Sequence, residues 1–202
     1  MQQSIPLTGD HVDQTYVGAV HTGAVFTRGG YERCRFEKCT FTEAQLVDAR
    51  FTDCEFVGCE LSALGLRGTS FTHVRFVDCR AMGVDWTAAA QLTFSVSFER
   101  CRMDNSTFGR QRLRGLTVVE CSLRGADFSG CDLSNARFTK SDLRGALVRH
   151  ATLKGADFAD AVGFAFDRTN KAGKTKVNLE TALQLLTDLG LVVPDLDRLM
   201  GL

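Results

Sequence analysis

The sequence has little that would support catalysis or membrane insertion. It contains no run of 18 apolar residues, so no segment is long enough to cross a bilayer as a helix. The segment 172–175, Ala-Gly-Lys-Thr, is not a phosphate-binding loop, because that motif requires a glycine where the sequence has Arg168. No paired catalytic residues and no cofactor motif are present. We therefore expect a protein without enzymatic activity, cofactor or small-molecule substrate.

A secretory signal is also missing from the start of the chain. Residues 1–14 have neither a basic first region nor an apolar stretch. We therefore expect a cytoplasmic protein that does not associate with membranes.

The eight cysteines lack the spacing of metal or disulfide sites. No Cys-x-x-Cys pair occurs, and the four histidines are scattered. Free cysteine packs as a small apolar residue. We interpret the cysteines as reduced core residues and expect no metal; a metal or disulfide framework is the alternative.

A five-residue repeat organises the chain. Between Cys121 and Phe158 a large apolar residue returns every five positions, with a small residue two positions before it. The same register extends backwards to Phe26, which gives 26 units, and 12 of the 15 phenylalanines lie at the large position. Neither an α-helix nor a flat strand produces this period. The eight cysteines all occupy the small position.

The units Ala-Asp-Phe-Ser-Gly and Cys-Asp-Leu-Ser-Asn, at 126–135, resemble the consensus of the pentapeptide-repeat family. This resemblance covers roughly residues 24 to 160. It implies an all-β fold, a right-handed quadrilateral parallel β-helix in which four units form one coil. The large and small positions both point inward, and stacked coils bury a continuous core. At four units per coil, the 26 units would form about 6.5 coils.

The repeat divides the chain into three parts. We expect an N-terminal cap over residues 1–23, the β-helix over 24–160, and a C-terminal helix and tail over 161–202. The register breaks once, because 12 positions rather than 10 separate Trp86 from Phe98. We interpret the break as a loop that carries function, since loops on rigid scaffolds often do. A tolerated insertion without a role is the alternative. The loop residues are Thr87, Ala88, Ala89, Ala90, Gln91, Leu92, Thr93, Phe94 and Ser95.

Leu92 and Phe94 are the apolar residues of this loop that would lie outside the core, unless they fold back against Trp86. Farther along the chain, Arg110, Arg112 and Arg114 form a basic cluster. The cluster could contact nucleic acid or an acidic protein face. The absence of interleaved aromatic residues favours the alternative, an ordinary solvated surface.

The C-terminal part contains one clear helix, over residues 178–189. Asn178 is a suitable N-cap and Gly190 a suitable C′ residue. One face of this helix, and the tail that follows, are apolar. The apolar residues either cover the last coil or form a two-fold homodimer. They include Leu179, Ala182, Leu183, Leu186, Leu189, Leu191, Val193, Leu196 and Leu199.

Several segments resemble a functional subgroup of the family, the proteins that protect DNA gyrase and topoisomerase IV from poisons. These segments are 34–46, 75–87, 97–101 and 160–164, together with the terminal helix. The subgroup includes quinolone-resistance proteins and the albicidin-resistance protein, which is the nearest resemblance. The likeness implies a homodimeric rod that binds the topoisomerase, with the loop touching the enzyme. It also implies a role in antibiotic resistance or self-immunity.

Charge bears on how such a rod would act. Members of the subgroup are proposed to mimic DNA, which requires a strongly negative surface. Here 24 basic residues balance 24 acidic ones, and residues 87–158 carry 11 bases and 7 acids, a net charge of +4. We therefore favour direct contact with the enzyme over complete mimicry of DNA. A scaffold protein with an unrelated partner is the second hypothesis.

Overall fold

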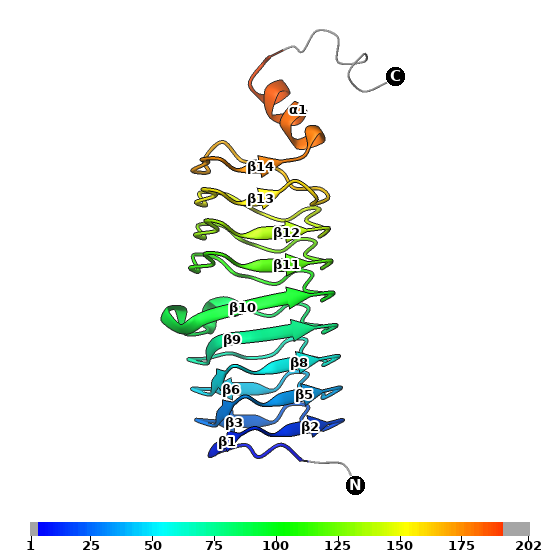
Figure 1. The fold of residues 1–202 in the computed structure, drawn as a ribbon, viewed down its shortest axis with the longest axis vertical. Coiled ribbons are helices and arrows are strands. Elements are labelled where there is room, and N and C mark those ends of the chain that lie inside the picture. Colours follow the sequence, from blue (N-terminus) through cyan, green and yellow to red (C-terminus); the bar gives the residue numbers. More distant parts are fainter. Residues whose placement is uncertain (1–3, 192–202) are drawn as a thin grey trace.

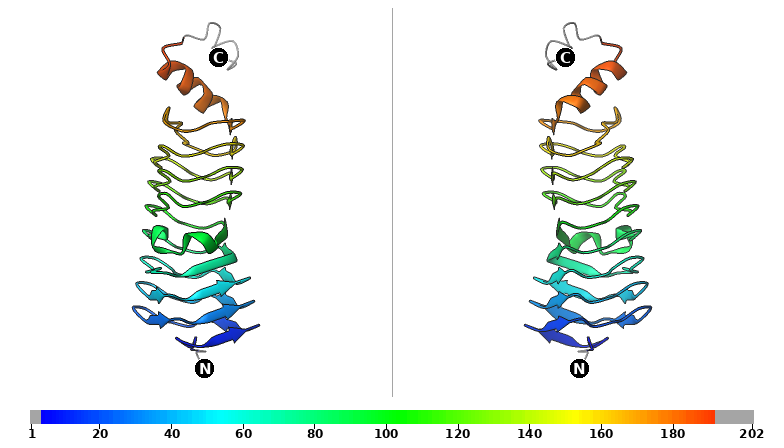
Figure 2. Two further views of the ribbon diagram at one scale, coloured as in Figure 1. Left: turned by 90° about the vertical axis from the view of Figure 1, so that its left-hand side faces the viewer. Right: turned by 90° about the vertical axis from the view of Figure 1, so that its right-hand side faces the viewer.

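The computed structural model describes residues 4–191, which form a long rod of stacked coils (Figure 1). Two further views show that helix α1 lies at one end of the rod, beyond the last coil (Figure 2). The elements are β1 (Asp10–Val12), β2 (Thr15–Val17), β3 (Val25–Thr27), β4 (Gly30–Glu32), β5 (Arg35–Glu37), β6 (Gln45–Val47), β7 (Arg50–Thr52), β8 (Glu55–Val57), β9 (Ser70–Val77), η1 (Trp86–Ala88), η2 (Gln91–Thr93), β10 (Phe94–Glu99), β11 (Thr117–Val119), β12 (Arg137–Thr139), β13 (Asp157–Phe158), β14 (Lys176–Val177) and α1 (Leu179–Asp188).

All strand pairs are parallel, and the register confirms the repeat. Arg35 pairs with Glu55 and Glu55 with Arg75, so each residue lies beside the residue 20 positions later. Twenty residues correspond to four five-residue units, as a quadrilateral coil requires. One column of strands runs β2–β5–β8–β9–β10–β11–β12–β13–β14 along the rod. The fold is therefore the right-handed parallel β-helix that the repeat predicts.

The core consists of columns of like side chains. Phe36, Phe56 and Phe76 stack with ring centroids 4.5 and 5.0 Å apart and nearly parallel planes. Trp86, Phe108 and Phe128 form a second column, on a different side of the coil, with spacings of 5.8 and 4.8 Å. Such offset stacking adds to the apolar burial that stabilises each coil on its neighbour.

The cysteines line the core at the small positions, as predicted, and all eight are buried and free. Most also donate a weak hydrogen bond to a backbone carbonyl of the preceding coil. The Sγ of Cys59 lies 3.2 Å from the oxygen of Phe36, and the Sγ of Cys79 lies 3.3 Å from that of Phe56. Thr69 makes the equivalent contact to Leu46 at 2.7 Å. The small position therefore selects side chains that fill little space and satisfy a buried carbonyl.

The solenoid begins earlier than the sequence predicted. Strands β1 and β2 pair with β4 and β5, and Val20 bridges Thr40, so residues 10–23 form a coil and not a cap. The predicted cap over 1–23 is therefore wrong for this segment. The register is hard to see in the sequence because two of its large positions hold His11 and His21.

Residues 4–9 cover the first coil. Ile5 is buried, and its N–H donates to Nε2 of His21 at 3.0 Å. The ring of His21 lies 5.2 Å from that of Phe26. Burial lowers the pKa of His21, which favours the neutral imidazole that can accept this bond. The cap thus shields one end of the core with a single apolar residue.

The coils also continue beyond residue 160, where the sequence predicted only a helix and tail. Val162 bridges Asp142, Lys171 bridges Thr152, and β14 pairs with β13. The last two pairings join residues 19 apart, so this coil is one residue shorter than a regular coil of 20. Because of this deletion, the five-residue register cannot be recognised in the sequence of this coil.

Candidate partner-binding site

The predicted loop is a compact insertion and not an extended loop. It contains two 3-10 turns, η1, which begins at Trp86, and η2. The coil below holds the segment between them, because the N–H of Gly68 donates to the oxygen of Ala88 at 3.0 Å and the N–H of Ala90 donates to Thr69 at 2.9 Å. Gln91–Thr93 therefore form the part that lies outside the regular path, visible beside the start of β10 in Figure 1.

The strand pairing explains the size of the insertion. Phe94 pairs with Phe71 and Val96 with Val74, so the offset falls from 23 to 22 residues between them. Three residues are thus inserted before Phe94, and one is lost immediately after it. The missing residue lies opposite Thr72–His73 of β9, and β10 runs from Phe94 to Glu99.

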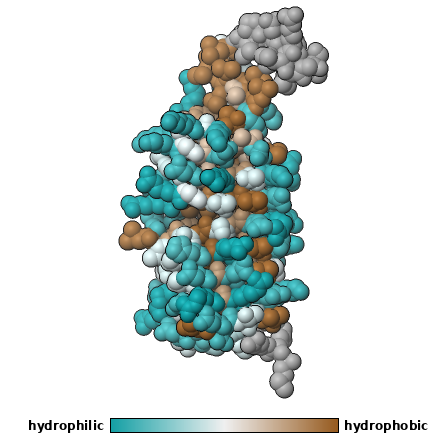
Figure 3. Space-filling view, viewed as in Figure 1, coloured by the Kyte–Doolittle hydropathy of each residue, from teal (hydrophilic) through white to brown (hydrophobic). Residues whose placement is uncertain are grey.

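The two large apolar residues of the insertion differ in burial. Phe94 is buried and packs edge-on against Trp86 at 5.9 Å and Phe71 at 6.1 Å. The prediction that Phe94 lies outside the core is therefore wrong, and its alternative, folding back against Trp86, is confirmed. Leu92 is 88% exposed, the most exposed large apolar residue in the described part of the chain. The space-filling view shows a hydrophobic projection at this height of the rod (Figure 3).

Gln111 supports the base of the insertion, a role that sequence reasoning missed. It occupies a small inward position one coil above Ala89 and is completely buried. Its Nε2 donates to the oxygen of Trp86 at 2.8 Å, at the residue where the insertion begins. The Oε1 of Gln111 and the Nε1 of Trp86 have no partner among the described residues. The sequence did contain a signal for this role, because Gln111 is a long polar residue at a position that in most units holds a small one.

A shallow hollow of about 120 Å³ lies beside the insertion. It is lined by Phe94 and Val96 from β10, and by Arg114 and Leu116 from the coil above. Leu92 and the hollow together give the middle of the rod an apolar projection beside a small depression.

Helix α1 docks on the last coil through polar contacts at its first turn. Asn178 caps the helix by accepting from the N–H of Thr181 at 2.9 Å, and its Nδ2 donates to the oxygen of Ala161 at 3.0 Å. The hydroxyl of Thr181 donates to the oxygen of Phe164 at 3.1 Å. Thr181 is the buried residue of the helix. Beyond Thr181, a cleft of about 180 Å³ lies between the helix and residues 163–166 of the coil.

The predicted apolar face of α1 is only partly covered. Leu179 and Leu189 are 54% and 49% exposed, and Leu191 is 54% exposed. Ala182, Leu183 and Leu186 are half-buried. Val193, Leu196 and Leu199, which were predicted to share this surface, lie outside the described residues. Hydrophobic atoms gather on the helix at this end of the rod (Figure 3).

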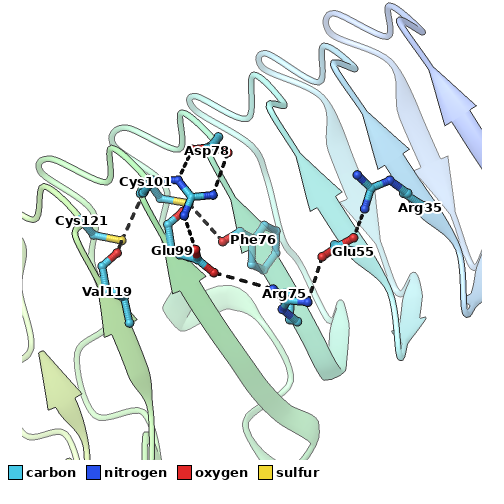
Figure 4. Close-up of polar contacts among 10 residues, drawn as sticks. Arg35, Glu55, Arg75, Phe76, Asp78, Glu99, Cys101, Val119 and Cys121 are labelled. Carbon is cyan, nitrogen blue, oxygen red and sulfur yellow. Dashed lines mark hydrogen bonds and ion pairs between the residues drawn. The ribbon is translucent and has the colours of Figure 1, made fainter. Parts of the chain in front are cut away.

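Charged residues form ladders along the outside of the rod. Arg35, Glu55, Arg75 and Glu99 follow one another on neighbouring coils, with Arg75 at 3.1 Å from Glu55 and 3.7 Å from Glu99 (Figure 4). Acidic and basic groups alternate in this column. The pattern gives local neutrality, which agrees with the balanced composition.

Asp142 is a carboxylate of these ladders that binds two arginines. It accepts hydrogen bonds from Arg124 and Arg144, both at 2.6 Å. These bonds hold the pKa of Asp142 well below its usual value, and the bond from Arg144 has the larger effect. A lowered folded-state pKa gives stability that is present above the unfolded pKa of about 4 and is lost as pH falls. We expect the melting temperature to fall between about pH 5 and pH 2, and Asp142→Asn to flatten that decline.

Circular dichroism melts from pH 7 to pH 2 measure this effect. The matched control is Asp160→Asn, because Asp160 is exposed and has no ion pair among the described residues. A decline that is equally steep in the Asp142→Asn variant and in the unchanged protein would contradict the assignment.

Residues 4–191 contain no cluster of three metal-ligating side chains that could hold an ion. No helix in this range is long and apolar enough to cross a bilayer.

The coil geometry defines the class of protein, a solenoid of five-residue units. A profile of the family described as "Pentapeptide repeat region" matches residues 31–95 and 90–161. The chain therefore belongs to the pentapeptide-repeat family. No curated protein sequence gives a match.

Several solved structures are similar to this chain. A trypsin-treated variant of QnrB1, a plasmid-mediated fluoroquinolone resistance protein, is 23% identical, with 92% of this chain and 100% of that chain covered and a TM-score of 0.42. HetL from the cyanobacterium Nostoc sp. strain PCC 7120, which is involved in the regulation of heterocyst differentiation, is 20% identical, with 84% and 85% covered and a TM-score of 0.49. A pentapeptide repeat protein from the Arabidopsis thaliana thylakoid lumen is 21% identical, with 65% and 69% covered and a TM-score of 0.28.

Proposed function

We propose that this protein binds DNA gyrase or topoisomerase IV and protects the enzyme from topoisomerase poisons. The observation that carries the proposal is the single insertion at the middle of the rod. It presents Leu92 almost fully to solvent, while Phe94 and Gln111 fix its base. An exposed leucine on a rigidly held turn is suited to enter a pocket of a partner, because little conformational entropy is lost on binding. The sequence resemblance of segments such as 75–87 supports the choice of partner.

The distribution of charge favours direct contact over mimicry of DNA. Duplex DNA carries one negative charge for about every 1.7 Å of its axis. In the column of Figure 4, Glu55 lies between Arg35 and Arg75, and Glu99 lies 3.7 Å from Arg75. A partner that approaches this side of the rod meets alternating charges and not a continuous negative row. We therefore assign recognition to the insertion.

Gyrase supercoiling assays test the proposal. Purified protein is titrated into gyrase, and separately into topoisomerase IV, in the presence of a quinolone or albicidin. Restored activity in the drug is the expected result, and a variant with residues 91–93 replaced by Gly-Ser-Gly is expected to lose it. Inhibition of supercoiling without a drug would instead indicate competition with DNA. No effect on either enzyme would refute the proposal and leave a scaffold role with an unrelated partner.

The same proposal includes a cytoplasmic homodimer without catalytic activity. The inward positions are filled by side chains, which supports a binding function for the outer surface. The helix contacts its own coil through Thr181 and keeps its apolar face half open, which favours a second copy as the cover. The dimer surface consists of Leu179, Ala182, Leu183, Leu186, Leu189 and Leu191 among the described residues.

Replacing Leu183 and Leu186 with glutamate is expected to convert the dimer to a monomer. Two charges cannot be buried unpaired in an apolar two-fold interface. Sedimentation equilibrium measures the mass, which should fall to the 22.2 kDa of one chain. Gln184→Glu, on the exposed part of the same helix, is the control and should leave the dimer intact. A monomer before any substitution would contradict this part of the proposal.

A further inference from the structure

One side of the rod, above the insertion, carries an excess of basic residues. Arg112, Asp132, Thr152 and Lys171 follow one another on successive coils. Four further basic residues, Arg110, Arg114, Lys154 and Lys174, flank this column. We define the basic face by its exposed cations, which are Arg110, Arg112, Arg114, Lys154, Lys171 and Lys174. Asp132 is the carboxylate of the column, and Arg114 already holds it at 2.9 Å.

The basic face differs from the ladders on the other sides. There, most bases of the same half of the rod are paired, as Arg124 and Arg144 are with Asp142, and Lys140 is with Glu120; Arg137 is an exception among the described residues. On the basic face, only Arg114 has a carboxylate oxygen within 4 Å among the described residues. The five remaining cations are therefore available to an external anion.

Glycines position two of these cations. A Cβ on Gly130 would lie 3.2 Å from the Cγ of Arg110, and one on Gly173 would lie 3.6 Å from the Cγ of Lys154. Each long side chain thus lies against a glycine of the next coil and extends along the rod. Such contacts restrict the side chains before any partner binds, which lowers the entropic cost of binding.

We propose that the basic face binds double-stranded DNA through its phosphate backbone, without sequence preference. The rungs from Arg112 to Lys171 span roughly 14 Å at the usual strand spacing. Arg110 to Arg114 span about 12 Å along one coil, which is comparable to the width of a major groove. Several phosphates can therefore be contacted together. The proposal does not depend on binding to a topoisomerase.

The chemistry of the face favours duplex DNA over other anions. Protein interfaces have an apolar centre, whereas the column between the cations holds Asp132 and Thr152. Proteins that bind single strands stack bases on aromatic side chains, and no cation of this face is accompanied by an aromatic residue at an outward position. Contacts to a duplex backbone require only cations in suitable places.

Fluorescence anisotropy with a labelled 30-base-pair duplex of arbitrary sequence tests the inference. We expect binding at 50 mM salt that weakens steeply towards 200 mM. Contacts to about three to five phosphates predict a slope of roughly −3 to −4.5 in a plot of log K against log salt. The variant Arg112→Glu, Lys154→Glu, Lys171→Glu is expected to bind at least about tenfold more weakly at 50 mM salt.

A matched variant separates this surface from net charge. Arg28→Glu, Lys38→Glu, Arg67→Glu changes the charge equally, at positions on the other half of the rod that have no ion pair among the described residues. It is expected to retain most of the binding. Equal losses in the two variants, no binding by the unchanged protein, or binding to poly-glutamate in place of DNA would each overturn the inference. Melting curves confirm that both variants are folded.

Discussion

Leu92→Glu is expected to raise the concentration of protein needed for protection of gyrase about 30-fold. Leu92 is 88% exposed and has no role in the core, so its removal should leave the rod folded. An apolar anchor at the centre of an interface contributes about 2 kcal/mol or more, which corresponds to roughly 30-fold in affinity. A carboxylate at the same place would in addition lose its hydration on entering an apolar pocket. The measurement is the midpoint of a supercoiling titration in the presence of a quinolone.

Leu147→Glu is the control for this prediction. Leu147 is also a surface leucine, 43% exposed, but lies on a regular coil far from the insertion along the chain. The same chemical change there should alter the midpoint by less than about twofold. Equal effects of the two substitutions would show that the insertion is not the recognition element. If Leu92→Glu protects gyrase with an unchanged midpoint, another part of the rod must recognise the enzyme.

The regular coils could be predicted from the sequence because their core is selected at every fifth residue. Phe36, Phe56 and Phe76 must each fill the same space on successive coils, and only large apolar side chains do so. The period therefore survives in the sequence, and the cysteines at the small positions follow it. Neighbouring coils impose the same requirement from both sides, which is why the pattern holds on coils that lie between two others.

The ends could not be predicted, because each terminal coil has a neighbour on one side only. His11 and His21 take large positions in the first coil, where Ile5 and not another coil covers the core. In the last coil the one-residue deletion is tolerated, and Phe164 stacks on Phe158 at 3.9 Å to close the end. Both departures conceal the repeat in the sequence while preserving the pairing of the backbone.

The candidate site was located by its break in register, but its shape was not predictable. The count of residues gives a net insertion of two and cannot show that three are added before Phe94 and one is lost after it. That difference decides that Phe94 lies in the core and Leu92 outside. Similarly, the apolar stripe of α1 identifies a surface to be covered without indicating that Thr181, a polar residue, makes the contact with the coil.

Trp86→Ala is expected to destabilise the protein by about 3–5 kcal/mol, the usual loss for a large aromatic residue in a core. Trp86 is completely buried where the insertion begins. Its ring lies 5.3 to 6.0 Å from those of Phe71, Phe76, Phe94, Phe98 and Phe108. These rings belong to two successive coils, one on each side of the insertion, so one side chain joins the two halves of the rod.

In a solenoid each coil contacts only its neighbours, and weakening one interface can therefore separate the unfolding of the two sides. We expect urea denaturation of Trp86→Ala, followed by circular dichroism, to show two transitions in place of one. Trp86→Phe is the matched control. It retains an aromatic ring and removes the Nε1–H that has no partner among the described residues, so its cost should stay below about 1.5 kcal/mol. A single transition with a loss under about 1 kcal/mol in Trp86→Ala would show that the backbone ladders alone couple the halves.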